Sequence, residues 1–338
     1  MKRVTIKDVA NATGLSIATV SYVLNGKGNI PEETRQIVNE AVQKLGYIPD
    51  YSARSLVSRK SNLIGVVIPQ AEPGSTLMFQ NPFYSEILSS IEYTARKNGY
   101  HVMISGTNAD EKYLKLAQQR NLDGIIIIGM YSHESYADLT KANIPLVLVD
   151  SYVDDHHFHT IKINDRYGGY IATRYLIEHG HRKIAFLSGA LRESSVNRQR
   201  LAGYYDALKE YGIPICKDYV LTDQINFHAG MHLAQTVKNS TDVTAVFCTA
   251  DVLALGVIKE LNKNERVVPE QISVMGFDNL EIAEFCVPGL TTVGQDIYQK
   301  GKTAVELVLN HIKNPNIGKQ EISLPVSIVE RESVRTIS

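Results

Sequence analysis

Apolar residues near the start of the chain recur at helical spacing. Two sets, each spaced i, i+3, i+4, are Ile6, Val9 and Ala10, and then Val20, Val23 and Leu24. Gly14 separates the sets, and Thr5 and Ser16 stand where the N-caps of two short helices would lie. Two such helices with a glycine turn predict a helix-turn-helix, whose second helix enters the major groove of DNA. Any hairpin of two helices would share this spacing.

A third helix follows, and after it a polar segment. Pro31 precedes a predicted helix over Glu32–Leu45, and Gly46 is placed to end it. Its apolar face supplies the partner that two short helices need in order to fold. Residues 47–61 are rich in Ser and Arg and too polar to pack alone, so they predict a linker.

From Leu63 onward, short apolar runs alternate with helix-length segments. The predicted strands are Leu63–Ile68, His101–Ile104, Gly124–Ile128, Leu146–Val149, Ile184–Leu187, Ala245–Cys248 and Ile272–Gly276. The predicted helices include Ser85–Asn98, Gly169–His179, Arg200–Tyr211, Ala229–Lys238 and Val252–Asn262. One open sheet rarely holds so many units. We therefore expect an all-α helix-turn-helix head and an α/β body of two doubly wound parallel-sheet subdomains.

Charge and cysteine content narrow the function classes. Residues 1–62 hold nine Lys and Arg against five Asp and Glu, a formal charge of +4 that leaves −5 for the rest. A basic head is typical of DNA binding, although a solvated helical surface would also explain it. Cys216, Cys248 and Cys286 are far apart and predict neither a disulfide framework nor a zinc site. With no signal peptide or long apolar run, we expect a cytoplasmic protein without a membrane segment.

The head resembles that of the lactose-repressor (LacI/GalR) family of bacterial transcription regulators. The matching elements are Thr-Ile-Lys-Asp-Val-Ala, Ser-x-x-Thr-Val-Ser-x-Val-Leu-Asn, Glu-Thr-Arg, Leu-Gly-Tyr-x-Pro and Ala-Arg-Ser-Leu. The resemblance implies a DNA-binding domain at 1–46, a hinge helix at 47–62, and an effector-binding and dimerisation domain at 63–338. It also implies a body like a periplasmic sugar-binding protein, with lobes at 63–163 plus 293–325 and at 164–290 plus 326–338. The chain would cross between them near Asn164, Pro288–Gln295 and Leu324–Val329.

The predicted DNA contacts fall into three groups. Ile17, Ala18 and Tyr22 lie opposite the apolar face of the second helix and are expected to read bases in the major groove. Phosphates are expected to meet Thr5, Ser16, Thr19, Ser21 and Asn25, unless Thr5 and Ser16 are only helix caps. The linker is expected to contact DNA through Tyr47, Ala53, Arg54 and Leu56, to fold only on DNA, and to insert Leu56 into the minor groove.

Polar residues at strand ends predict a binding site in the body, because ligands of such sheets bind beyond the carboxyl ends of the strands. Asp150 and Asp278 each end a strand, Gln295 follows Leu-Thr-Thr-Val-Gly, and Arg200 is expected to open a helix. Carboxylates and a guanidinium facing one space can bind adjacent hydroxyls, although each could instead cap a helix or pair internally.

The family resemblance favours Arg200 and Asp278 most and adds further effector residues. It implies Phe83 and Tyr84 at the first lobe, and Ile225, followed by Phe227, where relatives carry a stacking aromatic. The loop at 70–81 is longer than usual, and Ala250 stands where an Asn is frequent. These departures leave the identity of the effector open.

Other chemistry has little support in the sequence. A cluster of His156, His157 and His159 with Asp154 and Asp155 could suggest a metal, but such a run is usually a solvated loop, so none is expected. No nucleophile, base and acid assemble, and no glycine-rich phosphate loop is present, so neither an enzyme nor a cofactor is expected.

The leading hypothesis is therefore a homodimeric repressor that binds a pseudo-palindromic operator under the control of a small, sugar-like effector. A solute-binding protein and a sugar-processing enzyme fused to a DNA-binding head are the alternatives. The DNA-binding head argues against the first, and the missing catalytic constellation argues against the second.

Overall fold

The computed structural model describes residues 4–26, 28–48, 60–70, 79, 81–108, 119–129, 139–140, 144–152, 157–192, 195–240, 242–263 and 266–337. The chain divides into two compact units, a head (Met1–Ser61) and a body (Asn62–Ser338). Each unit has its own hydrophobic core. Ala53, Arg54 and Leu56, three of the predicted DNA contacts, lie outside the described residues.

The head is a bundle of three helices, α1 (Ile6–Thr13), α2 (Ile17–Leu24) and α3 (Glu32–Leu45). Its core joins Val9 of α1, Val20 of α2 and Val38 of α3, all with no exposed surface. Gly14 and Gly46 follow α1 and α3 with positive φ of 68° and 62°, the left-handed conformation that glycine adopts without strain. The three helices predicted from apolar spacing are therefore confirmed.

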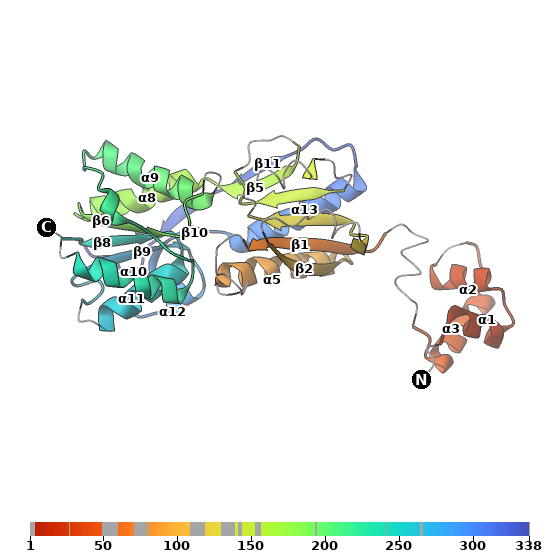
Figure 1. Ribbon diagram of the computed structural model, residues 1–338. Coiled ribbons are helices and arrows are strands. Elements are labelled where there is room, and N and C mark those ends of the chain that lie inside the picture. The colour runs from red at the N-terminus through yellow and green to blue at the C-terminus, as the bar shows by residue number, and fades with distance from the viewer. Residues whose placement is uncertain are drawn as a thin grey trace. The chain divides into compact units, whose positions relative to one another are not determined.

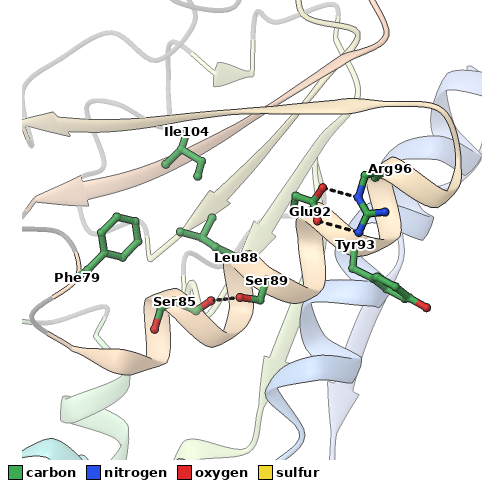
Figure 2. A pocket seen from close by; sticks show the side chains of 8 residues that line it. All are labelled: Phe79, Ser85, Leu88, Ser89, Glu92, Tyr93, Arg96 and Ile104. Carbon is green, nitrogen blue, oxygen red and sulfur yellow. Dashed lines mark hydrogen bonds and ion pairs between the residues drawn. The ribbon is translucent and has the colours of Figure 1, made fainter.

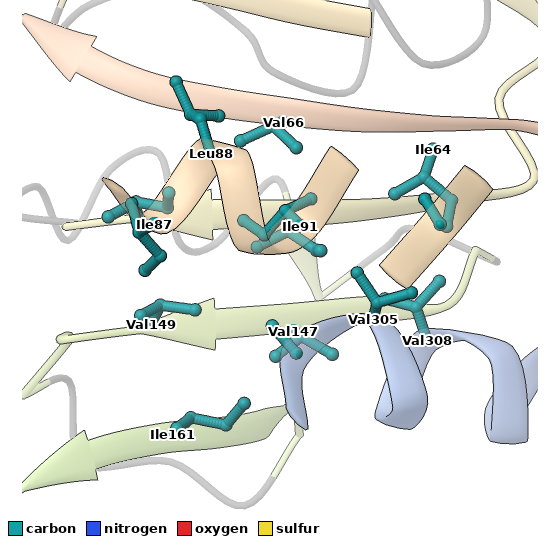
Figure 3. Close-up of a cluster of buried hydrophobic side chains, with 14 of the residues drawn as sticks. Ile64, Val66, Ile87, Leu88, Ile91, Val147, Val149, Ile161, Val305 and Val308 are labelled. Atoms are coloured by element: carbon teal, nitrogen blue, oxygen red, sulfur yellow. The ribbon is translucent and has the colours of Figure 1, made fainter. Parts of the chain in front are cut away.

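The first sheet of the body has six strands that pair in parallel, in the order β11-β5-β4-β3-β1-β2. Its strands are β1 (Leu63–Gln70), β2 (His101–Asn108), β3 (Gly124–Ile128), β4 (Leu146–Val149), β5 (His159–Ile163) and β11 (Glu321–Leu324). Helices α5 (Pro82–Lys97) and α13 (Ile297–Lys313) cover one face. Figure 3 shows the core between them, where Ile87 and Ile91 of α5 meet the strands and Val305 of α13.

The second sheet has the order β12-β10-β9-β8-β6-β7, parallel except for the edge strand β12. Its strands are β6 (Ile184–Ser188), β7 (Val220–Thr222), β8 (Ala245–Cys248), β9 (Ser273–Asp278), β10 (Thr291–Gln295) and β12 (Val326–Val329). Helices cover both faces (Figure 1), and they are α8 (Asp165–Glu178) with α9 (Val196–Glu210), and α10 (Phe227–Asn239) with α11 (Asp251–Lys263). Two short helices, η2 (Lys217–Tyr219) and α12 (Ile282–Phe285), also belong to the part of the body built on this sheet.

Parallel strands need their apolar residues on both faces, and the predicted runs supply them. The seven predicted strands and the two-subdomain α/β fold are confirmed. Cys248 is fully buried in β8, as expected of a small apolar side chain. Five strands were not predicted, β5, β7, β10, β11 and β12, and neither was the long helix α13.

Three predictions about where residues lie are wrong. Gly294 and Gln295 pair with β12, so residues 293–295 belong to the second sheet and not to the lobe predicted to begin at 293. Arg200 does not open a helix, because α9 begins at Val196 and Arg200 lies in its second turn. His159 is not in a solvated loop but in β5, with no exposed surface. Hereafter, the first lobe is the part built on the first sheet and the second lobe the part built on the second.

Close packing of α8 on α9 fixes the position of the residues they carry. A Cβ added at Gly203 of α9 would collide with the carbonyl oxygen of Arg166, and one at Gly169 of α8 with that of Arg200. The two backbones therefore touch, which brings Arg200 beside the first turn of α8.

We expect Gly203→Ala to lower the free energy of unfolding by about 1–3 kcal/mol or more, because the methyl group must push two backbones apart. Urea unfolding of the whole chain measures this value. Gly318→Ala is the matched control: its Cβ would meet nothing within 4 Å, so its effect should stay within about ±0.5 kcal/mol. Equal stability of the two variants would contradict direct contact between the helices.

Candidate functional site

In the head, α2 separates a buried face from an exposed one. Val20 and Val23 face the core, whereas the three predicted base contacts, Ile17, Ala18 and Tyr22, are exposed. Ile17 and Tyr22 expose 45% and 52% of their surface, although both are large and partly apolar. Such exposure is typical of a contact surface.

The predicted phosphate contacts take part in local hydrogen bonds. Ser16 caps α2, since its hydroxyl accepts from the Thr19 amide at 3.0 Å. Thr5 precedes α1, and its amide donates to the Asp8 carboxylate at 2.8 Å. The Asn25 amide donates to Ser21 at the end of α2. Tyr47 packs against the head core and is partly buried.

In the body, four predicted effector residues meet where the two lobes join. Asp150 follows β4, Asp278 and Gln295 end β9 and β10, and Arg200 reaches them from α9. All four are buried, with between 4% and 8% of their surface exposed. Asp150 and Asp278 have positive φ, 52° and 117°. Backbone strain of this kind in residues other than glycine clusters at functional sites.

Two chains of contacts connect these residues across the lobes. On one side, the Lys300 ammonium of α13 donates to both Asp150 oxygens at 2.7 and 2.9 Å and to the Gln295 carbonyl at 2.5 Å. The Gln295 amide then donates to Asp278 at 2.7 Å. On the other side, the Tyr152 hydroxyl donates to Asp165 at 2.7 Å.

The two chains meet at Arg200. Its Nε donates to Asp165 at 2.7 Å, and its Nη1 lies 3.9 Å from Asp278. Asp150 and Tyr152 are two residues apart in the sequence, so the backbone between them joins the two chains of contacts into a ring. We call this set the inter-lobe ring: Asp150, Tyr152, Asp165, Arg200, Asp278, Gln295 and Lys300.

Arg200 is held rigidly but keeps free donors. Besides its bond to Asp165, Nη1 donates to the Thr249 carbonyl at 2.5 Å, and the guanidinium lies 3.5 Å from the centre of the Phe277 ring. No described residue accepts from Nη2. Two N–H groups of a fixed guanidinium are thus available to a ligand.

Burial shifts the protonation of the carboxylates at this junction. Burial raises the pKa of Asp278 to about 7, against the lowering effect of Arg200 and Gln295. Burial also raises the pKa of Asp165, with Arg200 opposing, and raises that of Asp251, a neighbour at the start of α11. The Thr292 hydroxyl and the Leu280 amide donate to Asp251 at 2.6 and 2.8 Å. A perturbed carboxyl group among fixed charges is typical of a binding or catalytic site.

The other predicted effector residues lie around this ring. Phe83 is buried, with its ring centre 5.6 Å from the Lys300 nitrogen, and Tyr84 packs edge-on against it at 5.6 Å. Ile225 lies over Gly189, where a Cβ would come within 2.7 Å of it, and Phe227 begins α10 and is 36% exposed.

Two buried polar atoms near the ring have no hydrogen-bond partner among the described residues, the Ser151 hydroxyl and the Asn197 amide oxygen. Ser151 follows Asp150, and Asn197 lies one turn before Arg200 on α9. An unsatisfied buried polar atom costs about 1–3 kcal/mol, so both are candidate ligand contacts.

Three ring residues were not predicted from the sequence, Tyr152, Asp165 and Lys300. A signal for Lys300 was present, because it shares one helix face with Ile297 and Ala304, three residues before and four after. A lysine inside an apolar face is unusual and calls for a buried partner.

A separate surface groove of about 530 Å³ lies along α5. Figure 2 shows Leu88 and Tyr93 of α5 together with Phe79 and Ile104, beside the ion pair of Glu92 and Arg96. The exposed fractions are 55% for Phe79, 46% for Ile104 and 38% for Tyr93. On the second lobe, Phe285 and Val287 at the end of α12 are 72% and 87% exposed. Exposed apolar patches of this kind suggest contact with another protein surface.

The described ranges offer no metal or membrane feature. Among them, no group of three or more His, Cys, Asp or Glu could hold a metal ion. Nor does any helix of the described part have the length and apolar character needed to cross a membrane.

Sequence comparisons relate both units to known proteins. The family described as "Bacterial regulatory proteins, lacI family" matches residues 5–50, and "Periplasmic binding protein-like domain" matches residues 173–334. The ribose operon repressor of Haemophilus influenzae is 33% identical over 98% of this chain and 99% of its own. The HTH-type transcriptional repressor PurR of Vibrio atlanticus is 34% identical over 99% of both.

Solved structures agree with these relatives. The lac repressor dimer, bound to operator and the anti-inducer ONPF, has a TM-score of 0.84 and 29% identity over 99% of this chain and 100% of that one. A LacI family regulator from Enterococcus faecium with bound ribose has a TM-score of 0.72 and 27% identity, over 82% of this chain and 100% of that one.

The raised pKa of Asp278 predicts a pH dependence of stability. Its folded pKa of about 7 lies above the ordinary 3.8, so its stabilising contribution is complete below about pH 3.8 and is lost as the pH rises through 7. The free energy of unfolding should therefore fall as the pH rises from about 4 to 7, and Asp278→Asn should reduce that fall.

Urea unfolding at several pH values measures both slopes. Asp206→Asn is the control: Asp206 is exposed on α9 and its pKa is lowered by the bond to Arg166, so this variant should keep the wild-type slope. Identical slopes for wild type and Asp278→Asn would contradict the raised pKa of Asp278.

Proposed function

Because the chain belongs to the LacI family of bacterial transcription regulators, we propose that it is a repressor that binds operator DNA through its head and a small effector through its body. The observation that carries the proposal is the combination in one chain of an exposed recognition face on α2 with a buried ring of charges between two lobes. The relatives over the full length are named as repressors.

In the head, α2 is the element that reads the operator. Ile17 and Ala18 lie at its start, and Tyr22 lies one turn along on the same exposed side. This surface is mostly apolar, so contacts with thymine methyl groups should act alongside a hydrogen bond from the Tyr22 hydroxyl. Thr5, Ser16, Thr19, Ser21 and Asn25 flank it and are the proposed phosphate contacts.

In the body, the effector binds at the inter-lobe ring. Arg200 offers two unused N–H groups, Asp278 offers carboxylate oxygen, and Ser151 and Asn197 offer unsatisfied polar atoms. Paired donors and acceptors of this kind suit adjacent hydroxyl groups, which supports a sugar or sugar derivative. Such a ligand would control DNA binding by favouring one arrangement of the lobes.

The assembly that we propose is a homodimer. The similar lac repressor is a dimer on its operator, and this chain exposes apolar side chains on both lobes, along α5 and at the end of α12. Two copies joined along these surfaces would present two heads to a pseudo-palindromic site.

Binding rather than catalysis is the proposed activity of the body, since the full-length relatives are named as repressors. The proposed location is the cytoplasm, because that is where a bacterial repressor meets its operator.

A selection from random DNA with purified protein tests the DNA-binding part. We expect two inverted half-sites, and we expect Tyr22→Ala to weaken binding to them by about 1–3 kcal/mol and to relax preference at one base pair of each half-site. Ile37→Ala, which removes an exposed side chain from α3, is the control and should keep the wild-type preference. Unchanged preference at every position in the Tyr22 variant would rule out its role, and a single half-site would argue against the dimer.

Arg200→Lys tests the effector site. It keeps a positive charge beside Asp165 but removes the guanidinium fork, so effector affinity should fall by about 1.5–3 kcal/mol, the worth of a charged hydrogen bond. The measurement is calorimetric titration with any sugar or nucleoside that changes operator binding of the wild type.

Arg166→Lys is the matched control for this test, because Arg166 pairs with Asp206 on the exposed side of α8. It should bind the ligand as wild type does. Full affinity in Arg200→Lys would place the effector elsewhere.

A further inference from the structure

Lys300 is a lysine with no exposed surface, which is rare for this residue type. It lies on the face of α13 that packs into the first lobe, one turn after Ile297 and one turn before Ala304. Burial of an ammonium group is costly unless every donor is paired. The partners of Lys300 therefore show why this position carries a charge.

All three donors of the Lys300 ammonium are used. Two go to the oxygens of Asp150, at 2.7 and 2.9 Å, and the third to the Gln295 carbonyl oxygen. An ammonium group has three donors and no acceptor, so it is saturated. The pair with Asp150 neutralises that carboxylate and occupies one position on each of its oxygens.

The bond to Gln295 joins the two lobes. Helix α13 is anchored in the first lobe, where the Ser90 hydroxyl of α5 donates to the Tyr298 carbonyl at 2.5 Å. Gln295 ends β10 in the second sheet. The ammonium of the first lobe thus meets an amide of the second.

This bond also sets the direction of the Gln295 amide. With its oxygen held by Lys300, its NH₂ group points to Asp278, which it meets at 2.7 Å. Asp278 in turn lies 3.9 Å from Arg200. Without the ammonium, the amide would be free to turn, and both Asp278 and Arg200 would lose a fixed neighbour.

We propose that Lys300 is a positioning residue of the effector site, which holds Asp150 and Gln295 and thereby fixes the arrangement of the two lobes when no effector is bound. This inference rests on the proposed function and assigns the regulation of the same site. An effector acts by exchanging the bond between Lys300 and Gln295 for bonds of its own. The ligand then binds Arg200 and Asp278 in the second lobe. Loss of the bond between Lys300 and Gln295 allows α13, and with it the first lobe, to change position.

The test compares wild type with the double variant Lys300→Met/Asp150→Asn, which removes both charges and leaves no unpaired buried ion. The single variant Lys300→Met is measured as well, but it strands the Asp150 carboxylate and could fail to fold. Lys302→Met is the matched control, because Lys302 lies on the same helix, is 40% exposed and pairs only weakly with Glu306 at 3.8 Å.

The first measurement is amide hydrogen exchange of the full chain without ligand. In the double variant, we expect amides at the lobe crossings, residues 163–166 and 294–297, to exchange about tenfold faster, while those of β8 and α11 stay at the wild-type rate. Exchange at the crossings equal to wild type would overturn the proposal. A uniform rise across the body would also overturn it, because it would show a purely structural role.

The second measurement is affinity for the selected operator without effector. The double variant should differ from wild type by roughly 5- to 150-fold, the usual range of allosteric coupling, whereas Lys302→Met should not differ. Unchanged affinity would show that Lys300 does not control the lobes. If no ligand alters operator binding by the wild type, the proposed effector fails, but both ligand-free results still decide the role of Lys300.

Discussion

Every charge that is buried where the two lobes meet needs a partner of opposite charge or a hydrogen bond. The inter-lobe ring meets this constraint in a single arrangement of the lobes. Moving one ion out of water costs several kcal/mol even after relaxation. Its ion pairs and hydrogen bonds offset this cost only if their geometry is good. The ring holds three carboxylates, of Asp150, Asp165 and Asp278, against the two cations of Arg200 and Lys300. The pKa of Asp278 rises to about 7 because burial favours its neutral form. The pairing of these charges thus depends on how the two lobes are placed against each other.

Such a junction is a poor way to stabilise a protein, since apolar side chains of similar size often do better. The positive φ values of Asp150 and Asp278 add backbone strain at the same place. Both features are expected at a site that exchanges internal bonds for bonds to a polar ligand. The tight contact of α8 with α9 and of α13 with α5 holds Asp165, Arg200 and Lys300 on rigid elements.

The apolar pattern predicted much of the fold, because parallel strands buried on both faces read as short continuous runs. Helix ends were predicted less well. Helices α5, α8, α9 and α10 start two to four residues before their predicted positions, and each is capped by a side chain that accepts an amide bond: Asn81, Asn164, Ser195 and Asn226. These capping residues were visible in the sequence and would have corrected the starts.

The site was predicted only in part for a physical reason. Asp150 and Asp278 lie at the ends of apolar runs that were predicted as strands, and such ends can be located from the sequence. Gln295 ends β10, a strand that was not predicted. Tyr152, Asp165 and Lys300 join the ring through tertiary contacts between segments as far as 150 residues apart. No local pattern encodes such contacts. Of the three, Lys300 was the easiest to predict, because a lysine on an apolar helix face already required a buried partner.

The central claim is that one connected ring, and not two independent links, joins the lobes. A double-mutant cycle of unfolding free energy with Tyr152→Phe and Gln295→Met tests it most directly, because these residues make no hydrogen bond to each other and lie in different chains of contacts. The account predicts a coupling above about 0.5 kcal/mol, the level that distinguishes linked from independent sites. Additive effects of the two substitutions would contradict it.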